Sequence, residues 1–228
     1  MSILILSGGR TGTNMALEIL RGSNKLSATS NIHDEQTVKN GYKVSNNYLS
    51  KADTDSLSYE EICRFLDNNS NIKVIWTMRH PFDLMMCKIV RGQPNTEGRG
   101  NWLADDATPE KCIGSIMYMH DLYKKIKDKY GDRIMLIKME DIILDTEKLS
   151  KQLADFCEVE YNDSMPLFFE RMRNKHKKKR YKSVDKSQIN LFKNINKSYD
   201  GFFKTYKPNI QELFKEIEGL VEYYDYAR

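Results

Sequence analysis

The sequence predicts a three-layer α/β/α fold, in which helices cover both faces of a central, mainly parallel sheet. Short apolar runs alternate with longer amphipathic stretches along most of the chain. Strands joined by helices of ten or more residues are parallel, because only a long crossover returns the chain to the same edge of the sheet. The runs also lack polar alternation, which is typical of strands buried on both faces. No strand signal follows residue 160, so we expect a helical C-terminal third.

Each element of this fold has its own signal in the chain. Apolar runs predict strands over residues 3–6, 26–31, 73–78 and 133–139. Helical spacing of apolar residues predicts helices over 13–21, 57–68, 81 onward, 108–131, 145–157 and 208–224. Ser58 and Asp145 fit N-cap positions, and Pro81 fits the first position of a helix. Residues 36–56 and 92–107 are polar and aperiodic, so we expect loops there.

Length and composition indicate one globular domain. The 228 residues are 40% hydrophobic and 30% charged, with 12 Gly and 5 Pro, which excludes collagen-like and disordered classes. We expect a ligand-binding α/β core over residues 1–160 and a helical, basic segment over 161–228. No apolar run approaches the roughly 20 residues of a membrane helix. Four cysteines without a Cys-x-x-Cys spacing suggest neither a zinc site nor a redox pair. We therefore expect a cytoplasmic protein with no membrane span and no bound metal.

The first motif is the loop Ser7-Gly8-Gly9-Arg10-Thr11-Gly12-Thr13-Asn14, between a strand and a helix. Its glycines allow a tight turn, and the free N–H groups at the start of the helix can bind an anion. Arg10 adds a charged donor, and two threonines add hydroxyl donors. An ordinary glycine-rich turn is the alternative. No lysine stands where a Walker A loop needs one, which disfavours a magnesium-bound nucleoside triphosphate.

Two further motifs follow later strands. Arg79 comes directly after the strand 73–78, and Cys87 lies eight residues further on, in the next helix. Ligands of such sheets bind at the carboxyl ends of the strands, so Arg79 is a candidate ligand-binding residue; a structural pairing with Asp83 is the alternative. After the last strand comes Lys138-Met139-Glu140-Asp141-Ile142, whose acids we expect to position neighbouring loops.

Together these motifs resemble the sulfotransferases that use 3′-phosphoadenosine-5′-phosphosulfate (PAPS). Residues 10–14 match that family's phosphosulfate loop at four positions, with Asn14 in place of the usual final hydroxyl residue. Arg79 with Pro81 and Asp83 matches its 3′-phosphate motif, although Cys87 replaces the expected serine. Residues 139–142 resemble its Tyr-Glu-Asp-Leu signature. The resemblance spans residues 3–157 and implies a P-loop-like sheet.

The resemblance also implies site roles. Arg10 would neutralise charge on the transferring group, and the 5′-phosphate would lie on the loop. Arg79 with Cys87 would bind the 3′-phosphate, and the product would be adenosine 3′,5′-bisphosphate (PAP), without a metal. The expected cofactor-binding residues of the loop are Gly9, Arg10, Thr11, Gly12, Thr13 and Asn14.

An acceptor hydroxyl also needs a base within hydrogen-bonding reach. The cluster His33-Asp34-Glu35 lies between the two phosphate motifs. Glu35 is the first choice as the catalytic base and His33 the second. The alternative is a polar cluster in a solvated loop.

Residues 171–182 hold eight of the chain's 36 Lys and Arg and no acid. The rest of the chain, with 28 Lys and Arg against 32 acids, has a net negative charge. This run is a solvated face, a lid that brings Lys179 or Arg180 to the 3′-phosphate, or a site that recruits an anionic acceptor.

The leading interpretation is thus a sulfotransferase that acts on a hydroxyl or amine of a small-molecule or glycan acceptor. A nucleotide or nucleoside kinase of related architecture is one alternative. A polyanion or nucleic-acid binding module that uses the run 171–182 is the other, but no nucleic-acid motif supports it. The sequence does not indicate the acceptor or the oligomeric state.

Overall fold

The computed structural model describes residues 2–91, 109–171 and 208–226. The chain divides into two compact units. The first comprises Met1–Met78 and Met119–Arg180, and the second comprises Arg79–Tyr118 and Tyr181–Arg228. The expected division of one domain at residue 160 stays a prediction.

The first unit is built on a five-stranded sheet with the strand order β2-β3-β1-β4-β5. Every pair of neighbouring strands is parallel. The strands are β1 (Ser2–Ser7), β2 (Ser27–His33), β3 (Tyr48–Asp53), β4 (Ile72–Met78) and β5 (Ile134–Lys138). The side chains from Ile3 to Leu6 have no exposed area, because β1 is the central strand and is covered on both faces. The predicted strands are confirmed.

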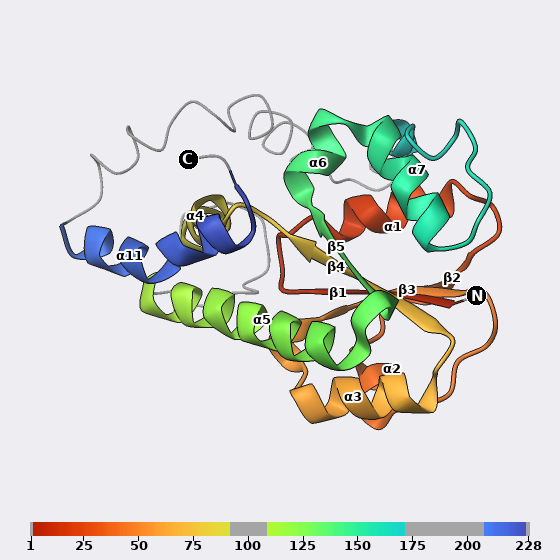
Figure 1. The fold of residues 1–228 in the computed structure, drawn as a ribbon, viewed down its shortest axis with the longest axis horizontal. Coiled ribbons are helices and arrows are strands. Elements are labelled where there is room, and N and C mark those ends of the chain that lie inside the picture. Colours follow the sequence, from red (N-terminus) through yellow and green to blue (C-terminus); the bar gives the residue numbers. More distant parts are fainter. Residues whose placement is uncertain (1, 92–108, 172–207, 227–228) are drawn as a thin grey trace. The chain divides into compact units, whose positions relative to one another are not determined.

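Helices cover both faces of this sheet. Figure 1 shows α1 (Thr13–Arg21) and α7 (Thr146–Phe156) on one side, and α2 (Glu35–Asn40) and α3 (Tyr59–Asn68) on the other. Lys73, on one face of β4, donates a hydrogen bond to the carbonyl of Phe156 at the end of α7. Trp76, on the opposite face, packs against Tyr123 with ring centroids 5.6 Å apart. The three-layer α/β/α prediction is therefore confirmed.

The helices of the first unit are α1 (Thr13–Arg21), α2 (Glu35–Asn40), η1 (Thr54–Ser56), α3 (Tyr59–Asn68), η2 (Gly131–Arg133), α6 (Met139–Leu144) and α7 (Thr146–Phe156). Two predicted caps are confirmed. Ser58 Oγ accepts the N–H of Glu61, whose carboxylate accepts the N–H of Ser58 in return. Asp145 Oδ1 accepts the N–H of Lys148 at the start of α7.

The second unit is helical in its described part. It contains α4 (Pro81–Arg91), the first residues of α5 (Pro109–Tyr130) and α11 (Pro208–Tyr223). α5 contributes its residues from Met119 onward to the first unit. α4 and α11 are in contact, and both carry buried apolar residues, Leu84 and Met85 on α4 and Leu220 and Val221 on α11.

One prediction was wrong. Residues 36–56 are not a loop, because they contain most of α2 and all of β3. The β3 sequence Tyr-Leu-Ser-Lys-Ala-Asp has no apolar run, yet Ser50 is fully buried and Lys51 is 6% exposed. Two polar residues inside a covered strand hid it from a search for apolar runs.

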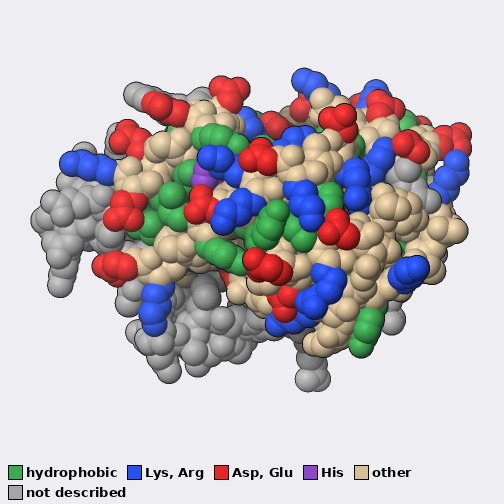
Figure 2. Space-filling model, turned by 60° about the horizontal axis from the view of Figure 1, so that its bottom comes forward, with side chains coloured by type: hydrophobic (Ala, Val, Ile, Leu, Met, Phe, Trp, Pro, Cys, Tyr) green, Lys and Arg blue, Asp and Glu red, His purple; other side chains and the backbone are tan. Residues whose placement is uncertain are grey.

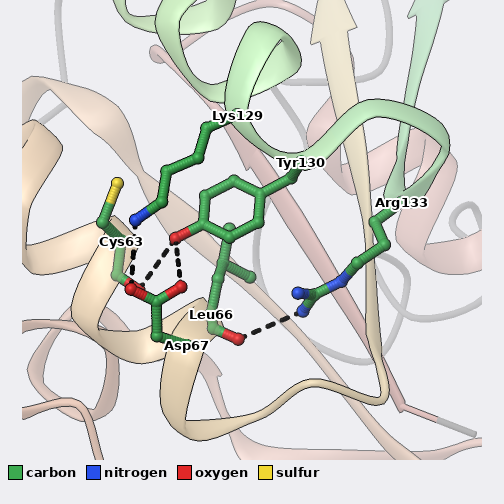
Figure 3. A network of polar contacts seen from close by, with 6 residues as sticks. All are labelled: Cys63, Leu66, Asp67, Lys129, Tyr130 and Arg133. Carbon is green, nitrogen blue, oxygen red and sulfur yellow. Dashed lines mark hydrogen bonds and ion pairs between the residues drawn. The ribbon is translucent and has the colours of Figure 1, made fainter.

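A polar network ties α3 to the end of α5 near the amino ends of β4 and β5 (Figure 3). Tyr130 Oη lies 2.8 Å from Asp67 Oδ1, and Lys129 Nζ lies 3.0 Å from Asp67 Oδ2. These two hydrogen bonds lower the pKa of Asp67. Arg133 donates to the carbonyls of Leu66, Asn69 and Ile72. Backbone oxygens at the end of a helix have no intrahelical donor, so Arg133 supplies donors where α3 gives way to β4.

Charged side chains of both signs are interspersed on the face that Figure 2 shows. Of the basic run 171–182, the structure describes only Arg171. Its guanidinium turns inward and donates to the carbonyls of Glu18, Ser164 and Met165. Burial lowers its pKa. In the described ranges no helix has the length and apolar character to cross a membrane.

Candidate functional site

The loop after β1 turns through two left-handed residues, Arg10 at φ 81° and Gly12 at φ 97°. A side chain at Gly12 would be strained by this φ, and its Cβ would lie 3.1 Å from Met139 Cγ. Gly12 is the N-cap of α1 and offers no side-chain cap. The first N–H groups of an α-helix have no intrahelical acceptor. Thr13 is half-buried and Asn14 is exposed, so this helix start can bind an anion.

Buried hydroxyl groups hold the loop from beneath. Thr11 is fully buried, and its Oγ1 lies 2.7 Å from Ser7 Oγ and 2.8 Å from Thr77 Oγ1. Ser7 Oγ donates to the carbonyl of Thr77 on the neighbouring strand β4. The N–H of Gly8 donates to Met119 Sδ at 3.2 Å. The Thr11 side chain thus makes its contacts inside the protein, and any contact with a ligand is through its backbone.

Carboxylates lie beside the glycines of this loop. β3 ends at Asp53, which is in register with Ser7 at the end of β1. Asp53 Oδ2 lies 3.5 Å from the position that a Cβ at Gly9 would take. Glu35 Oε1 accepts the N–H of Asp53 at 2.9 Å. The predicted base Glu35 is therefore at the same edge of the sheet as the loop, and Asp53 is a carboxylate that the sequence analysis missed.

Lys51 is a second residue that the sequence analysis missed. It lies two residues before Asp53 on β3 and is in register with Ile5 of β1. Burial lowers the pKa of its amine to about 8, against the opposing effect of Asp53 and Glu35. In the sequence Lys51 stands within a polar stretch, which is typical of an exposed residue, so no sequence pattern indicated that it is buried.

The other two residues of the predicted base cluster are Asp34, whose hydrogen bonds are described, and His33, of which only the backbone is described. Asp34 Oδ2 accepts a hydrogen bond from Tyr48 Oη at 2.7 Å, and its N–H donates to the carbonyl of Lys51. Asp34 therefore links the start of α2 to β3. His33 is in register with Lys51 at the end of β2, but its side chain lies outside the described part.

Arg79 follows directly on β4 and begins the second unit. It is 3% exposed, and its Nη2 lies 4.0 Å from Asp83 Oδ2. That separation is an ion pair but too long for a hydrogen bond. No described residue accepts a hydrogen bond from the guanidinium. A buried guanidinium with five donors and one distant carboxylate is suited to an anionic ligand.

His80 precedes α4, and its carbonyl accepts the N–H of Leu84. Its ring lies near those of Phe82 and Tyr226, with centroid distances of 5.5 and 5.0 Å. Burial lowers the pKa of His80; Asp83 raises it and Arg79 lowers it further.

The remaining predicted residues are placed as follows. Cys87 is on α4, but its side chain lies outside the described part, as do Lys179 and Arg180 entirely. After β5, the side chains of Met139 and Ile142 pack against Gly12. The third motif thus supports the loop through apolar contacts, where the sequence had suggested its acids. Within the described ranges no three His, Cys, Asp or Glu side chains gather as a metal site.

No family model matches the sequence, and no curated protein matches it. Solved structures do match. The mouse sulfotransferase SULT7A1 complexed with PAP is 16% identical, over 95% of this chain and 82% of that one, with a TM-score of 0.59.

Two further sulfotransferase domains match over a shorter part of this chain. The sulfotransferase domain of the curacin biosynthetic pathway is 14% identical, with a TM-score of 0.52 over 72% of this chain and 76% of its own. That of the Synechococcus PCC 7002 olefin synthase is 13% identical, with a TM-score of 0.53 over 72% and 75%. This chain therefore has a sulfotransferase-like fold.

Proposed function

We propose that this chain is a sulfotransferase that moves a sulfuryl group from PAPS to a hydroxyl or amine of a small-molecule or glycan acceptor. The observation that carries the proposal is the loop Ser7–Asn14, in a fold whose solved examples are sulfotransferases. The loop presents an uncapped helix start, carries Arg10 and has no lysine where a Walker A loop needs one.

The residues of the loop fit an anionic phosphosulfate group. The N–H groups of Thr13 and Asn14 begin α1 without a side-chain cap, and the helix dipole favours negative charge there. No acid stands in the first turn of α1 to compete. Arg10 would add a charged, forked donor for the oxygens of the group.

PAPS, when bound, supplies the sulfuryl group and carries PAP as the leaving group. Sulfuryl transfer forms a bond from the acceptor oxygen or nitrogen to sulfur and breaks the bond from sulfur to the phosphate oxygen. The proton of the acceptor must pass to a base. Glu35 remains the first choice, and Asp53, hydrogen-bonded to Glu35 through its backbone, joins His33 as a further candidate. Lys51, positively charged below pH about 8, would offset charge that builds up at this edge.

For the 3′-phosphate we propose Arg79. Removing a guanidinium from water is costly unless a counter-charge compensates it. Asp83 at 4.0 Å supplies part of that charge without taking up the donors. A phosphate monoester would accept hydrogen bonds from them and complete the compensation.

Thermal shift assays with PAP and with ATP test this proposal. In the absence of magnesium, PAP should raise the melting temperature and ATP should do so much less, since ATP lacks a 3′-phosphate. Radiolabelled PAPS should then transfer label to an acceptor from a panel of alcohols, amines and glycans. Equal shifts from PAP and ATP, or magnesium-dependent phosphoryl transfer, would overturn the assignment.

A further inference from the structure

The C-terminal end of α11 closes with a defined turn. The N–H of Tyr226 donates to the carbonyl of Val221, and the N–H of Asp225 donates to that of Glu222. Asp225 has φ 51°. This combination is a Schellman motif, in which a left-handed residue ends the helix and reverses the chain. Aspartate tolerates that conformation better than most residues do. The turn therefore fixes the direction in which Tyr226 leaves the helix.

After the end of α11, Tyr226 packs against His80, the residue that follows Arg79. Its ring centroid lies 5.0 Å from that of His80, with an angle of 57° between the planes. Phe82, in the first turn of α4, approaches His80 at 5.5 Å. His80 is 8% exposed, and Tyr224 of the same C-terminal turn is 2% exposed. A ring from the C-terminal end and a ring from α4 thus both pack near the imidazole.

His80 is bonded directly to Arg79 in the chain, so its position at the start of α4 also constrains the backbone of Arg79. The carbonyl of His80 accepts the N–H of Leu84, which makes it the N-cap of α4, and Arg79 is the residue before it. Among described residues, Asp83 at 4.0 Å is the polar neighbour of the Arg79 guanidinium. The direction of the guanidinium therefore depends in part on the backbone at residues 79 and 80 and on the ion pair with Asp83.

From these contacts we propose that Tyr226 is a positioning residue for Arg79. By packing on His80 it fixes the N-cap of α4, and so holds the guanidinium in the orientation that binds a phosphate monoester. This inference rests on the proposed function, in which Arg79 binds the 3′-phosphate of PAPS. It assigns a ligand-binding role to the C-terminal end of the chain, which carries no motif of its own.

Calorimetric titration of the full chain with PAP and with adenosine 5′-monophosphate tests the role. The second nucleotide lacks the 3′-phosphate, so the ratio of the two affinities measures the 3′-phosphate contacts alone. Tyr226→Ala should lower that ratio roughly tenfold, because a charged donor that is no longer held in place binds less well. Tyr226→Phe should keep the ratio, since the ring makes the contact with His80.

Tyr223→Ala is the matched control, because this tyrosine is 51% exposed on the same helix. It should leave the ratio unchanged. A purely structural role of Tyr226 would lower the melting temperature and the two affinities in parallel, and a folded Tyr226→Ala variant with an unchanged ratio would overturn the proposal.

A second pair of variants acts on the turn and leaves the ring in the chain. Asp225→Gly accepts the left-handed conformation and should keep the ratio, whereas Asp225→Val resists it and should lower the ratio. This pair decides the question if Tyr226→Ala does not fold, and equal ratios in the two variants would overturn the role. If the unaltered chain binds PAP no more tightly than the monophosphate, the assignment of Arg79 fails, and the role of Tyr226 fails with it. PAP selectivity that is independent of Tyr226 removes this inference alone.

Discussion

The loop after β1 and the turn after β4 hold their polar groups in opposite ways. In the loop, Thr11, Ser7 and Thr77 satisfy one another, and Gly8 donates to Met119. In the turn, Arg79 is equally buried but has an ion pair at 4.0 Å and no hydrogen-bond acceptor among the described residues. The polar groups of the loop are thus hydrogen-bonded within the protein, whereas the turn contains a strong donor that is available to a ligand.

The difference separates stability from binding. A residue that the protein itself satisfies costs folding free energy when it is removed, because its partners are then left unsatisfied. A buried charge kept for a ligand costs little or even stabilises when it is replaced by an apolar side chain. Variants in the two regions should therefore differ in which quantity they change.

The largest effect is expected at the carboxylates beside the loop. Glu35→Gln keeps an oxygen that can accept the N–H of Asp53 but loses the proton acceptor, so turnover should fall about 10²–10⁴-fold with little loss of stability. Initial rates at saturating PAPS and thermal unfolding measure the two quantities.

Asp53→Asn is the matched control for this variant. Full activity of Glu35→Gln together with an inactive Asp53→Asn would move the base to β3. If both variants were active and His33→Ala were not, the base would be His33.

Arg79→Met should weaken PAP binding by roughly 2–4 kcal/mol. The melting temperature should stay the same or rise, because methionine has similar length and no charge to desolvate. Calorimetry and thermal unfolding of the same preparation measure both quantities.

Arg10→Ala sharpens this result, since Arg10 should lose more turnover than PAP affinity if its contact grows as the leaving group gains charge. The opposite pattern in the two arginines would show that their roles are exchanged.

Gly12→Ala should reduce stability and PAP binding together. The left-handed φ and the 3.1 Å approach to Met139 together cost roughly 2–4 kcal/mol of unfolding free energy. Gly114→Ala is the matched control, because nothing lies within 4 Å of a Cβ at that helical position. It should stabilise the protein by up to about 1 kcal/mol. Urea unfolding measures both variants, and a Gly12→Ala variant as stable as the parent would mean that the loop is not held as described.

Lys51→Met should change stability somewhat less than Gly12→Ala does, and in the opposite direction. The folded pKa of about 8 lies below the usual 10.5, so between these values the unfolded chain binds the proton that the folded chain has lost. Stability from this group therefore rises with pH across that window. At pH 7 the variant should be more stable by roughly 1–3 kcal/mol, and the gain should shrink by pH 10.

Turnover should fall as Lys51 loses its proton, although stability rises. If the charge of Lys51 assists the reaction, the parent should lose activity above pH 8, and Lys51→Met should be slower with no such loss. Urea unfolding and rates from pH 6 to 10 measure these effects, and a variant that is both less stable and fully active would contradict the assignment.

Much of the fold could be predicted because most strands are continuous apolar runs. The runs at 3–6 and 73–78 have buried side chains on both faces, and their lengths and bounding residues left no helical alternative. β3 escaped because Ser50 and Lys51 stand in the middle of a strand that is covered on both faces, where a search for apolar runs expects no polar residue. Because its residues are polar, this stretch looked like a loop in the sequence. The same polar residues make it a candidate part of the site.

The site was predictable only as separate pieces. A glycine-rich loop between strand and helix and an arginine at a strand end are local patterns, so Gly12 and Arg79 were found. The pairing of Asp53 with Ser7 and its link to Glu35 depend on strand order, which no local pattern encodes. The contact of Tyr226 with His80 joins residues that are 146 positions apart in the printed sequence.

The sulfur of Met119 gives the loop an internal chemical reporter. Met119 is 1% exposed and accepts the N–H of Gly8. Peroxide oxidises exposed methionines readily, but it can reach this sulfur only when the loop and α5 separate locally. The rate at which Met119 sulfoxide accumulates, read by mass spectrometry, therefore reports how often the loop opens, without any label. A ligand that seats on the loop should slow that oxidation, and one that binds elsewhere should leave it unchanged.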